Sequence, residues 1–393
     1  MSDVVILAAV RTPIGKFGGT LKGMTAADLG VAAVRGALEA AGVPPGRVQD
    51  VVFGNGRQAG GGPNVARQIS VRAGIPHAVP ALTVNRACGS GLQAIVDIAR
   101  QIRGGEIEIG VAGGTESMSR LPFFLDRFRD GYRLGHGEVV DGMYRDGFHC
   151  PLANMLMGET AEVLADRYAI SRQEQDEYAV ETQRRCEAAR KAGRFDAERI
   201  ALDVPDGRGG SVRFQTDEHV RDGATLEGMA KLPPVFRKAG TVHAGNSSGI
   251  TDGAAAVVLA SAAAAAALGA VPLARLEGWD IAGVAPDVMG IGPVPAIRSL
   301  EKKTGHPLDT YDVIELNEAF AAQVIACDRE LKLPRERLNP NGGSIALGHP
   351  IGCTGARIVA TLLHEMKRRQ AKRGLATLCI SGGQGMAVSF TSP

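Results

Sequence analysis

The sequence predicts an α/β fold built from two similar halves, with a long segment inserted late in the first half. Short apolar runs bounded by loops alternate with stretches of helical periodicity, which is typical of a sheet covered by helices on both faces. This rhythm is lost between residues 120 and 249, where charge rises and aromatic residues gather, and it then restarts. We therefore divide the chain into an N-terminal half (1–119 and 250–270), an inserted segment (120–249) and a C-terminal half (271–393).

Each element of the first half has a local signal. Strands are expected over 4–10 and 48–53, because both runs are apolar and are followed by loops. Thr25 with Asp28 three positions later is a typical helix start, and that helix is expected to end at Gly42. The other expected elements are a helix from Asn64 through Arg72, a strand at 79–84, a helix carried by Leu92, Ile95, Ala99 and Ile102, and a strand at 107–112.

The inserted segment and the second half are interpreted by the same signals. The inserted segment is expected to hold two helices, over 158–168 and 172–192, and to carry binding surface. After it we expect strands at 252–260, 274–281 and 313–315, helices at 261–268, 293–304 and 319–331, a loop and helix over 344–364, and a terminal hairpin of 376–380 with 386–390.

Composition narrows the classes of partner. The chain has 393 residues, with 44 Lys and Arg against 42 Asp and Glu, so neither nucleic acid nor a membrane surface is an expected partner. The N-terminus lacks the pattern of a signal peptide, and no apolar run is long enough to span a membrane. Six scattered cysteines without a CxxC pair fit reduced thiols, so a cytoplasmic location is expected.

Cys88 lies between an apolar run, expected to be a buried strand, and the start of a helix. The first N–H groups of a helix have no partner within the helix and carry partial positive charge. A thiolate at that place is stabilised, so we expect Cys88 to have a lowered pKa and to be a nucleophile near neutral pH. A free cysteine is also commonly a buried structural residue, and this stretch alone leaves both interpretations open.

Four further segments could carry chemistry. Asn317 follows an expected strand, His349 stands in a glycine-dense loop before a helix, Cys379 precedes a glycine-rich turn, and residues 243–249 form a loop of small residues. A cysteine activated by a histidine is an acyl-transfer arrangement, and a second cysteine offers a separate acid or base. Backbone N–H groups at Cys88 and in the turn after Cys379 could bind the developing oxyanion. Taken singly, these residues also have structural explanations as a loop histidine, a core residue and a helix cap.

Together the motifs resemble those of the thiolases, a family of acyl-CoA C-acyltransferases, along nearly the whole chain. The resemblance implies a thiolase-like fold, with a mixed five-stranded sheet in each half, covering helices and an inserted loop domain. It also implies the reversible condensation of acetyl-CoA with an acyl-CoA, with acetyl-CoA acetyltransferase as the expected activity. The matching segments are VNRACGSG (84–91), GGTESM (113–118), AGNSSGITDG (244–253), NEAF (317–320), NPNGGSIALGHPIG (339–352) and CISGGQG (379–385).

The resemblance also implies catalytic roles. Cys88 matches the nucleophile that carries the acyl group, and His349 matches the residue that deprotonates it and helps to form one oxyanion hole. Asn317 matches the asparagine that holds a water molecule in that hole. Cys379 matches the acid and base at the α-carbon of acetyl-CoA. The backbone N–H groups of Cys88 and Ser381 match the second oxyanion hole.

Further residues are implied to bind the substrate. Ser248 matches a serine that contacts the pantetheine arm of CoA, and Arg221 matches an arginine near the CoA nucleotide. Met157, Ala319 and Phe320 match positions that line the pocket. We expect CoA as a co-substrate, no tightly bound cofactor, no metal, and a homo-oligomer that is a dimer or a homotetramer built as a dimer of dimers.

Two departures from the family pattern affect these expectations. Members specific for acetoacetyl-CoA carry a histidine where this chain has Leu156, which leaves longer or branched acyl chains open, although residues 133–146 look more like the biosynthetic branch. The turn after Cys379 has Ser381 where a glycine is usual. A positive φ at that position would be strained for serine.

Three other classes of function deserve comparison. The loop at 245–249 fits the G-x-S-x-G pattern of serine hydrolases, but a strand rather than a helix is expected to follow it. A non-catalytic acyl-CoA or lipid carrier on the same fold is expected to lack one of Cys88, His349 and Cys379, and all three are present. A ketoacyl synthase is expected to use two histidines in place of a second cysteine.

Overall fold

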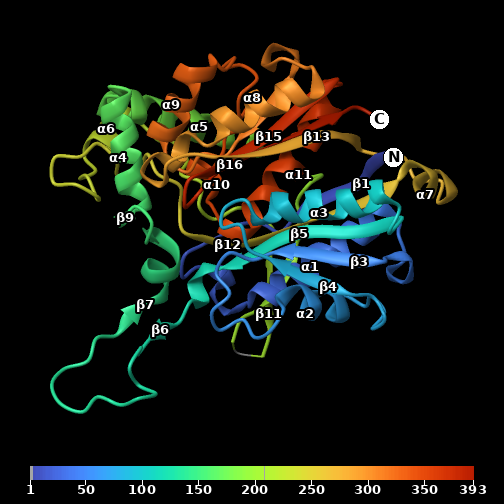
Figure 1. The fold of residues 1–393 in the computed structure, drawn as a ribbon, viewed down its shortest axis with the longest axis horizontal. Coiled ribbons are helices and arrows are strands. Elements are labelled where there is room, and N and C mark those ends of the chain that lie inside the picture. The colour runs from blue at the N-terminus through green and yellow to red at the C-terminus, as the bar shows by residue number, and fades with distance from the viewer. Residues whose placement is uncertain (1–2, 208) are drawn as a thin grey trace.

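The computed structural model describes residues 3–207 and 209–393 (Figure 1). The strands are β1 (Val4–Arg11), β2 (Gly15–Lys16), β3 (Asp50–Gly54), β4 (Ala81–Val84), β5 (Ile109–Ser117), β6 (Phe123–Phe124), β7 (Val140–Asp141), β8 (His149–Cys150), β9 (Met155–Leu156), β10 (Leu202–Pro205), β11 (Ser211–Phe214), β12 (Thr251–Ser261), β13 (Ala274–Gly283), β14 (Val313–Leu316), β15 (Arg373–Ile380) and β16 (Gln384–Thr391).

The helices alternate with these strands in both halves. They are α1 (Ala26–Ala41), α2 (Val65–Arg72), α3 (Ser90–Gly104), α4 (Met157–Arg167), α5 (Arg172–Lys191), α6 (Leu226–Ala230), α7 (Ala262–Ala267), α8 (Pro293–Thr304), α9 (Ala321–Leu331), α10 (Ser344–Leu347) and α11 (Ile351–Arg369). Short turns of helix are η1 (Thr20–Gly23), η2 (Pro45–Arg47), η3 (Met118–Arg120), η4 (Tyr144–Phe148), η5 (Pro286–Ile291) and η6 (Leu308–Thr310). Among the described residues, no helix is both long and apolar enough to cross a membrane.

The main sheet is mixed and, over the described residues, has ten strands. Its order is β14-β15-β16-β13-β1-β12-β5-β3-β4, with β2 paired to β12. The predicted α/β class and two-half arrangement are confirmed, but the halves are joined rather than held in two separate five-stranded sheets. The junction between β1 and β13 is short, with Val5 opposite Arg275 and Ile6 opposite Ala274.

The elements form five layers, which Figure 1 shows from the side. Helices α1 and α2 pack on one face of the N-terminal strands, and helices α8 and α9 pack on the far face of the C-terminal strands. Helices α3 and α11 lie between the two sets of strands and share one apolar core with both. Because its two faces are covered, β12 is buried along its whole length and has an almost continuous apolar sequence.

Local signals located most elements correctly. Thr25 caps α1 in a capping box with Asp28, and Gly42 ends that helix in a left-handed conformation. The strand expected at 79–84 is shorter and only half-buried, because β4 lies at the edge of the sheet. The loop and helix expected over 344–364 are present as the loop that holds His349 and α11, but the short helix α10 precedes them.

The inserted segment supplies the remaining small sheets together with α4, α5 and α6. Between β6 and β7 the chain makes a long excursion away from the layers (Figure 1). Phe128 and Leu134 lie exposed on this excursion. The binding surface expected of the inserted segment stays a prediction. The boundaries of the inserted segment at 120 and 249 stay a prediction.

A buried ion cluster joins the inserted segment to β1. The guanidinium of Arg11 donates from Nε to Glu198 Oε1 at 2.6 Å, and from Nη1 and Nη2 to the carboxylate of Asp217 at 2.7 and 3.0 Å. All three side chains are buried. The cluster therefore connects residues about 200 positions apart in the chain.

Candidate active site

One cavity of about 460 Å³ collects most of the residues that the sequence singled out. It opens where the two halves of the sheet meet the inserted segment, because its lining comes from all three parts of the chain. The predicted site residues that line it are Cys88, Met157, Arg221, Ser248, Ala319, Phe320, His349, Cys379 and Ser381. Asn317 does not line the cavity. It lies buried two positions before Ala319, which does.

Cys88 stands in a tight loop between β4 and α3, two residues before the first residue of the helix. Ala87 has a positive φ of 44°, and its N–H donates to Asn85 Oδ1 at 2.9 Å. The hydroxyl of Ser90 accepts from the N–H of Arg86 at 2.9 Å and donates to the carbonyl of Ala87 at 2.7 Å. These bonds hold the left-handed turn that directs Cys88 into the cavity.

The expectation of a lowered pKa at Cys88 is wrong for the free protein. Burial raises the pKa of the Cys88 thiol above its ordinary value. The positive charge of Arg57 and the N–H groups of Ser381 and of Cys88 itself act in the opposite direction but do not outweigh burial. Desolvation wins because the sulfur is enclosed, whereas the helix beginning at Ser90 offers only partial charges. Cys88 therefore rests as a thiol and needs a base.

His349 has the properties expected of such a base. Its Nδ1 lies 2.6 Å from Thr354 Oγ1, and the same oxygen donates to the carbonyl of Pro350 at 3.0 Å. Since the threonine hydroxyl has one hydrogen, it accepts from Nδ1–H and leaves Nε2 without a proton. Nε2 is buried without a partner, and burial lowers the pKa of His349 to about 3. The imidazole is therefore neutral, with its free nitrogen available to a nearby thiol.

Cys379 ends β15 and faces the same cavity. Burial raises the pKa of its thiol well above the ordinary value, and the neighbouring Cys88 raises it further. The positive φ angles of the following turn fall on Gly382 and Gly383, at 86° and 88°. The strain expected at Ser381 is therefore absent, and its N–H points toward the sulfur of Cys88.

Asn317 is held by a chain of hydrogen bonds. Arg357 Nη2 donates to Ser344 Oγ at 2.8 Å, and Ser344 donates its own hydrogen to Asn317 Oδ1 at 2.6 Å. This bond fixes the side-chain amide, with its oxygen toward Ser344 and its nitrogen away from it. The Nδ2 group is buried and has no partner within the described residues. The Nδ2 group is therefore a fixed hydrogen-bond donor that no described residue uses.

Comparison with known proteins agrees with this geometry. Residues 4–263 match the thiolase N-terminal domain and residues 270–392 match the thiolase C-terminal domain. The chain belongs to the thiolase family. It is 51% identical to an acetyl-CoA acetyltransferase of Cupriavidus necator over 390 residues, which cover 99% of each chain.

Solved thiolase structures share the whole fold. A Bacillus anthracis acetyl-CoA acetyltransferase, 45% identical, superposes with a TM-score of 0.98 and covers 100% of this chain and 99% of its own. Human mitochondrial 3-ketoacyl-CoA thiolase in complex with CoA, 44% identical, has a TM-score of 0.96 with coverage of 100% and 98%. The thiolase-like fold predicted from the motifs is confirmed.

The serine-hydrolase alternative is not supported. Ser247, at the centre of the G-x-S-x-G match, donates its hydroxyl to the carbonyl of His243 at 2.8 Å. The ring of His243 is already used, because Nδ1 accepts from the N–H of Gly245 at 3.0 Å and Nε2 lies 2.6 Å from Asp176. The loop is followed by β12 rather than by a helix, so no strand-to-helix nucleophile turn exists here.

The cavity also contains residues that sequence reasoning missed, among them Arg57 and His219. Arg57 lies in the glycine-rich loop after β3, and His219 lies in the inserted segment near Arg221. Burial lowers the pKa of His219, whose Nδ1 lies 3.0 Å from the carbonyl of Ala346. The available signal for Arg57 was its place after the carboxyl end of a parallel strand, where sites commonly form.

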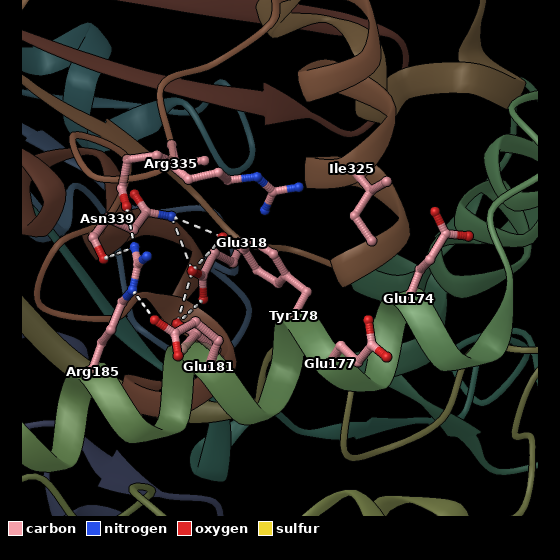
Figure 2. A pocket seen from close by; sticks show the side chains of 11 residues that line it. Glu174, Glu177, Tyr178, Glu181, Arg185, Glu318, Ile325, Arg335 and Asn339 are labelled. Carbon is pink, nitrogen blue, oxygen red and sulfur yellow. Dashed lines mark hydrogen bonds and ion pairs between the residues drawn. The ribbon is translucent and has the colours of Figure 1, made fainter.

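A second pocket, of about 340 Å³, lies beside the NEAF segment and is lined mainly by charged residues of α5 (Figure 2). Glu318 is at its base and accepts from the hydroxyl of Tyr178 at 2.8 Å and from Asn339 Nδ2 at 3.0 Å. On its rim, Arg185 pairs with Glu181 at 2.7 Å. The bond from Tyr178 holds α5 against the segment that carries Asn317. Among the described residues, no group of histidine, cysteine and acidic side chains could hold a metal ion.

Proposed function

We propose that this thiolase transfers an acyl group between CoA and the α-carbon of acetyl-CoA, as an acetyl-CoA acetyltransferase. The observation that carries the proposal is the meeting of two thiols, Cys88 and Cys379, with the unprotonated nitrogen of His349 in one cavity. The relatives named acetyl-CoA acetyltransferase support the same activity.

In the direction of cleavage, His349 Nε2 takes the proton of Cys88, and the sulfur attacks the 3-keto carbonyl of a 3-ketoacyl-CoA. The bond between the α- and β-carbons breaks, and its electron pair leaves with acetyl-CoA as an enolate. The acyl group stays on Cys88 as a thioester. The thiol of CoA then attacks that thioester and releases the shortened acyl-CoA.

Cys379 supplies and removes the proton at the α-carbon. Its raised pKa keeps it a thiol, so it protonates the departing enolate during cleavage. In condensation, Cys379 first gives its proton to the CoA sulfur that leaves when an acyl-CoA acylates Cys88. The resulting Cys379 thiolate then takes a proton from the α-carbon of acetyl-CoA, and the enolate attacks the acylated Cys88. Two cysteines are required because the nucleophile is occupied as a thioester when the second proton transfer occurs.

Two sets of donors suit the oxyanions of these steps. The N–H groups of Cys88 and Ser381 both lie near the reactive sulfur, where an acyl oxygen would become negative. The other set is the unused Nδ2 group of Asn317, acting through a water molecule, and Nε2–H of His349 once that nitrogen carries the proton taken from Cys88. Fixed donors of this kind stabilise an enolate without reorganisation.

CoA is the proposed co-substrate, and the solved human thiolase with CoA supports this. Ser248 and Arg221 both line the cavity, which supports the proposal that Ser248 contacts the pantetheine arm and Arg221 the nucleotide. Leu156 and Met157 line the cavity beside Phe320, so the acyl end meets an apolar wall that suits chains longer than acetoacetyl. The absence of a tightly bound cofactor stays a prediction.

We also propose that the chain assembles with copies of itself, as a dimer or a dimer of dimers. The half-buried β4 is an edge strand with an exposed Leu82, and Phe128 and Leu134 are exposed on the excursion after β6. Light scattering during size-exclusion chromatography measures the mass of the particle in solution and tests the proposal. The mass of a single chain would contradict it. A cytoplasmic location is a prediction that the six unpaired cysteines support.

The test of the proposed function is thiolytic cleavage of acetoacetyl-CoA and longer 3-ketoacyl-CoAs by Cys88→Ala and Cys379→Ala. We expect the first variant to form no acyl-enzyme and to lose activity by several orders of magnitude. The second should still be acylated at Cys88 but should not exchange the α-proton of acetyl-CoA with solvent. Full thiolytic activity of Cys88→Ala would end the proposal.

A further inference from the structure

Arg57 brings a positive charge to the wall of the catalytic cavity. It belongs to the loop after β3 and is buried, with 8% of its surface exposed. Its Nη2 donates to the carbonyl of Gly147 at 2.8 Å and its Nη1 to the carbonyl of Gly56 at 3.3 Å. Cys88 and His349 line the same cavity. A buried cation on this wall requires an explanation, because desolvation of a charge is costly.

No carboxylate hydrogen-bonds to the guanidinium of Arg57 within the described residues, because its side chain bonds to backbone carbonyls and its Nε has no partner. The nearest candidate, Glu116, is occupied elsewhere. It accepts from the N–H groups of Gly56, Arg57 and Gly352 at 3.0, 3.0 and 2.8 Å, and from Asn55 Nδ2 at 2.6 Å. Glu116 therefore braces the loop through its hydrogen bonds. Burial raises the pKa of Glu116, the charge of Arg57 acts against this increase through space, and the same charge also acts on Cys88.

We propose that Arg57 is a positioning residue whose charge stabilises the anionic sulfur of Cys88 when His349 takes its proton. The inference rests on the proposed function, because it takes Cys88 as the nucleophile. A buried cation is most useful beside a group that becomes negative during the reaction, and the thiolate is such a group. The carbonyls of Gly56 and Gly147 keep the guanidinium in place without cancelling its charge.

The charged and titratable groups that face Cys88 come from four places. They are Arg57 after β3, Glu116 on β5, His349 before α11 and Cys379 on β15. After burial, Arg57 has the largest effect on the pKa of Cys88 and lowers it, while Glu116 raises it by less. Arg57 also lowers the pKa of His349, but Arg357 has the larger effect there.

The test is the pH dependence of Cys88 alkylation by iodoacetamide in the full-length protein, followed by mass spectrometry of the Cys88 peptide. R57Q keeps an N–H donor for the Gly147 carbonyl but removes the charge. R57K keeps the charge but lacks the planar guanidinium group. We expect R57Q to react on the order of tenfold more slowly at neutral pH, with its profile displaced to higher pH. R57K should stay within about threefold of the unmodified protein.

A matched control is R67Q, because Arg67 also bonds only to backbone carbonyls, those of His77 and Val79, and lies outside the cavity lining. Its alkylation profile should be unchanged. An unchanged profile in R57Q, or equal slowing in R57K and R57Q, would overturn the inference and assign Arg57 a packing role.

Substrate selectivity distinguishes this inference from a role of the Arg57 charge in substrate recognition. If R57Q alkylates normally but loses a preference for 3-ketoacyl-CoAs with a terminal carboxylate, Arg57 recognises substrate and the inference is wrong. Alkylation needs no turnover, so it also separates this inference from the assignment of function. An active Cys88→Ala would end the proposed function, whereas an unaltered R57Q profile would end only the role of Arg57.

Discussion

The state of His349 depends on one hydroxyl group. Thr354 donates to the carbonyl of Pro350 and therefore accepts from Nδ1 of the imidazole, which leaves the opposite nitrogen free. The motif around His349 was recognisable in the sequence, but the partner that selects its tautomer was not. The reason is that Thr354 follows in α11, where a threonine bonded to the carbonyl four residues earlier is unremarkable.

We predict that Thr354→Val lowers kcat by about ten- to hundredfold, because a part of general-base catalysis is lost when the imidazole is no longer oriented. Steady-state thiolysis measures the effect, with thermal unfolding as a check on the fold. Thr354→Ser keeps the hydroxyl and should retain most of the activity. Equal kcat values for the valine variant and the unmodified protein would contradict this account of His349.

At the scale of elements, the site depends on how closely α3 and α11 approach. Helix α3 begins after Cys88 and α11 begins after His349, so the crossing of these helices sets the distance between nucleophile and base. A Cβ on Gly91 would lie 2.7 Å from the backbone nitrogen of Ala356. A Cβ on Gly355 would overlap the backbone nitrogen of Leu92. These two positions therefore require glycine because the backbones of α3 and α11 touch there, and not because a turn needs a positive φ.

Gly355→Ala should destabilise the protein by about 2 kcal/mol or more, because the overlap is with backbone atoms that cannot move aside. Chemical unfolding measures the change, and thiolysis should fall with it as Cys88 and His349 separate. Gly46→Ala is the control, since its φ is negative and no heavy atom lies within 4 Å of the added Cβ. It should change stability by less than about 0.5 kcal/mol. Similar values for the two variants would contradict the packing argument.

At the scale of the whole molecule, the cavity exists only because three parts of the chain meet. The ion cluster of Arg11, Glu198 and Asp217 holds the inserted segment against β1. Burial by itself raises the pKa of Asp217, but the charges of Arg11 and Arg199 bring it below the ordinary value. A lowered pKa in the fold means that the ionised form is stabilised by folding.

Asp217→Asn should cost about 3–5 kcal/mol at pH 7, because it leaves Arg11 buried with an incomplete partner. The stability from Asp217 is present above its unfolded pKa near 4 and is lost as the pH falls through the lower folded value. The difference between variant and unmodified protein should therefore shrink in acid. Urea unfolding at pH 7 and at about pH 3.5 measures it.

Asp203→Asn is the matched control for that prediction. Asp203 pairs with Arg213 at 3.1 Å on the exposed hairpin of β10 and β11, where both side chains are more than half exposed. Its loss should cost less than about 1 kcal/mol at either pH, because solvent screens the pair. A larger cost at Asp203 than at Asp217 would show that burial does not set the strength of these pairs.

The sequence by itself determined the alternation of strands and helices and the family. It also selected Cys88, His349 and Cys379 as candidate catalytic residues. These properties depend on local sequence patterns. The patterns are the spacing of apolar residues, helix caps, glycine-rich loops, and short motifs whose chemistry belongs to individual side chains. Only the tertiary structure decided the raised pKa of Cys88, the free nitrogen of His349 and the presence of Arg57 in the cavity. Burial and long-range partners set those properties, and neither can be deduced from the neighbours of a residue in the chain.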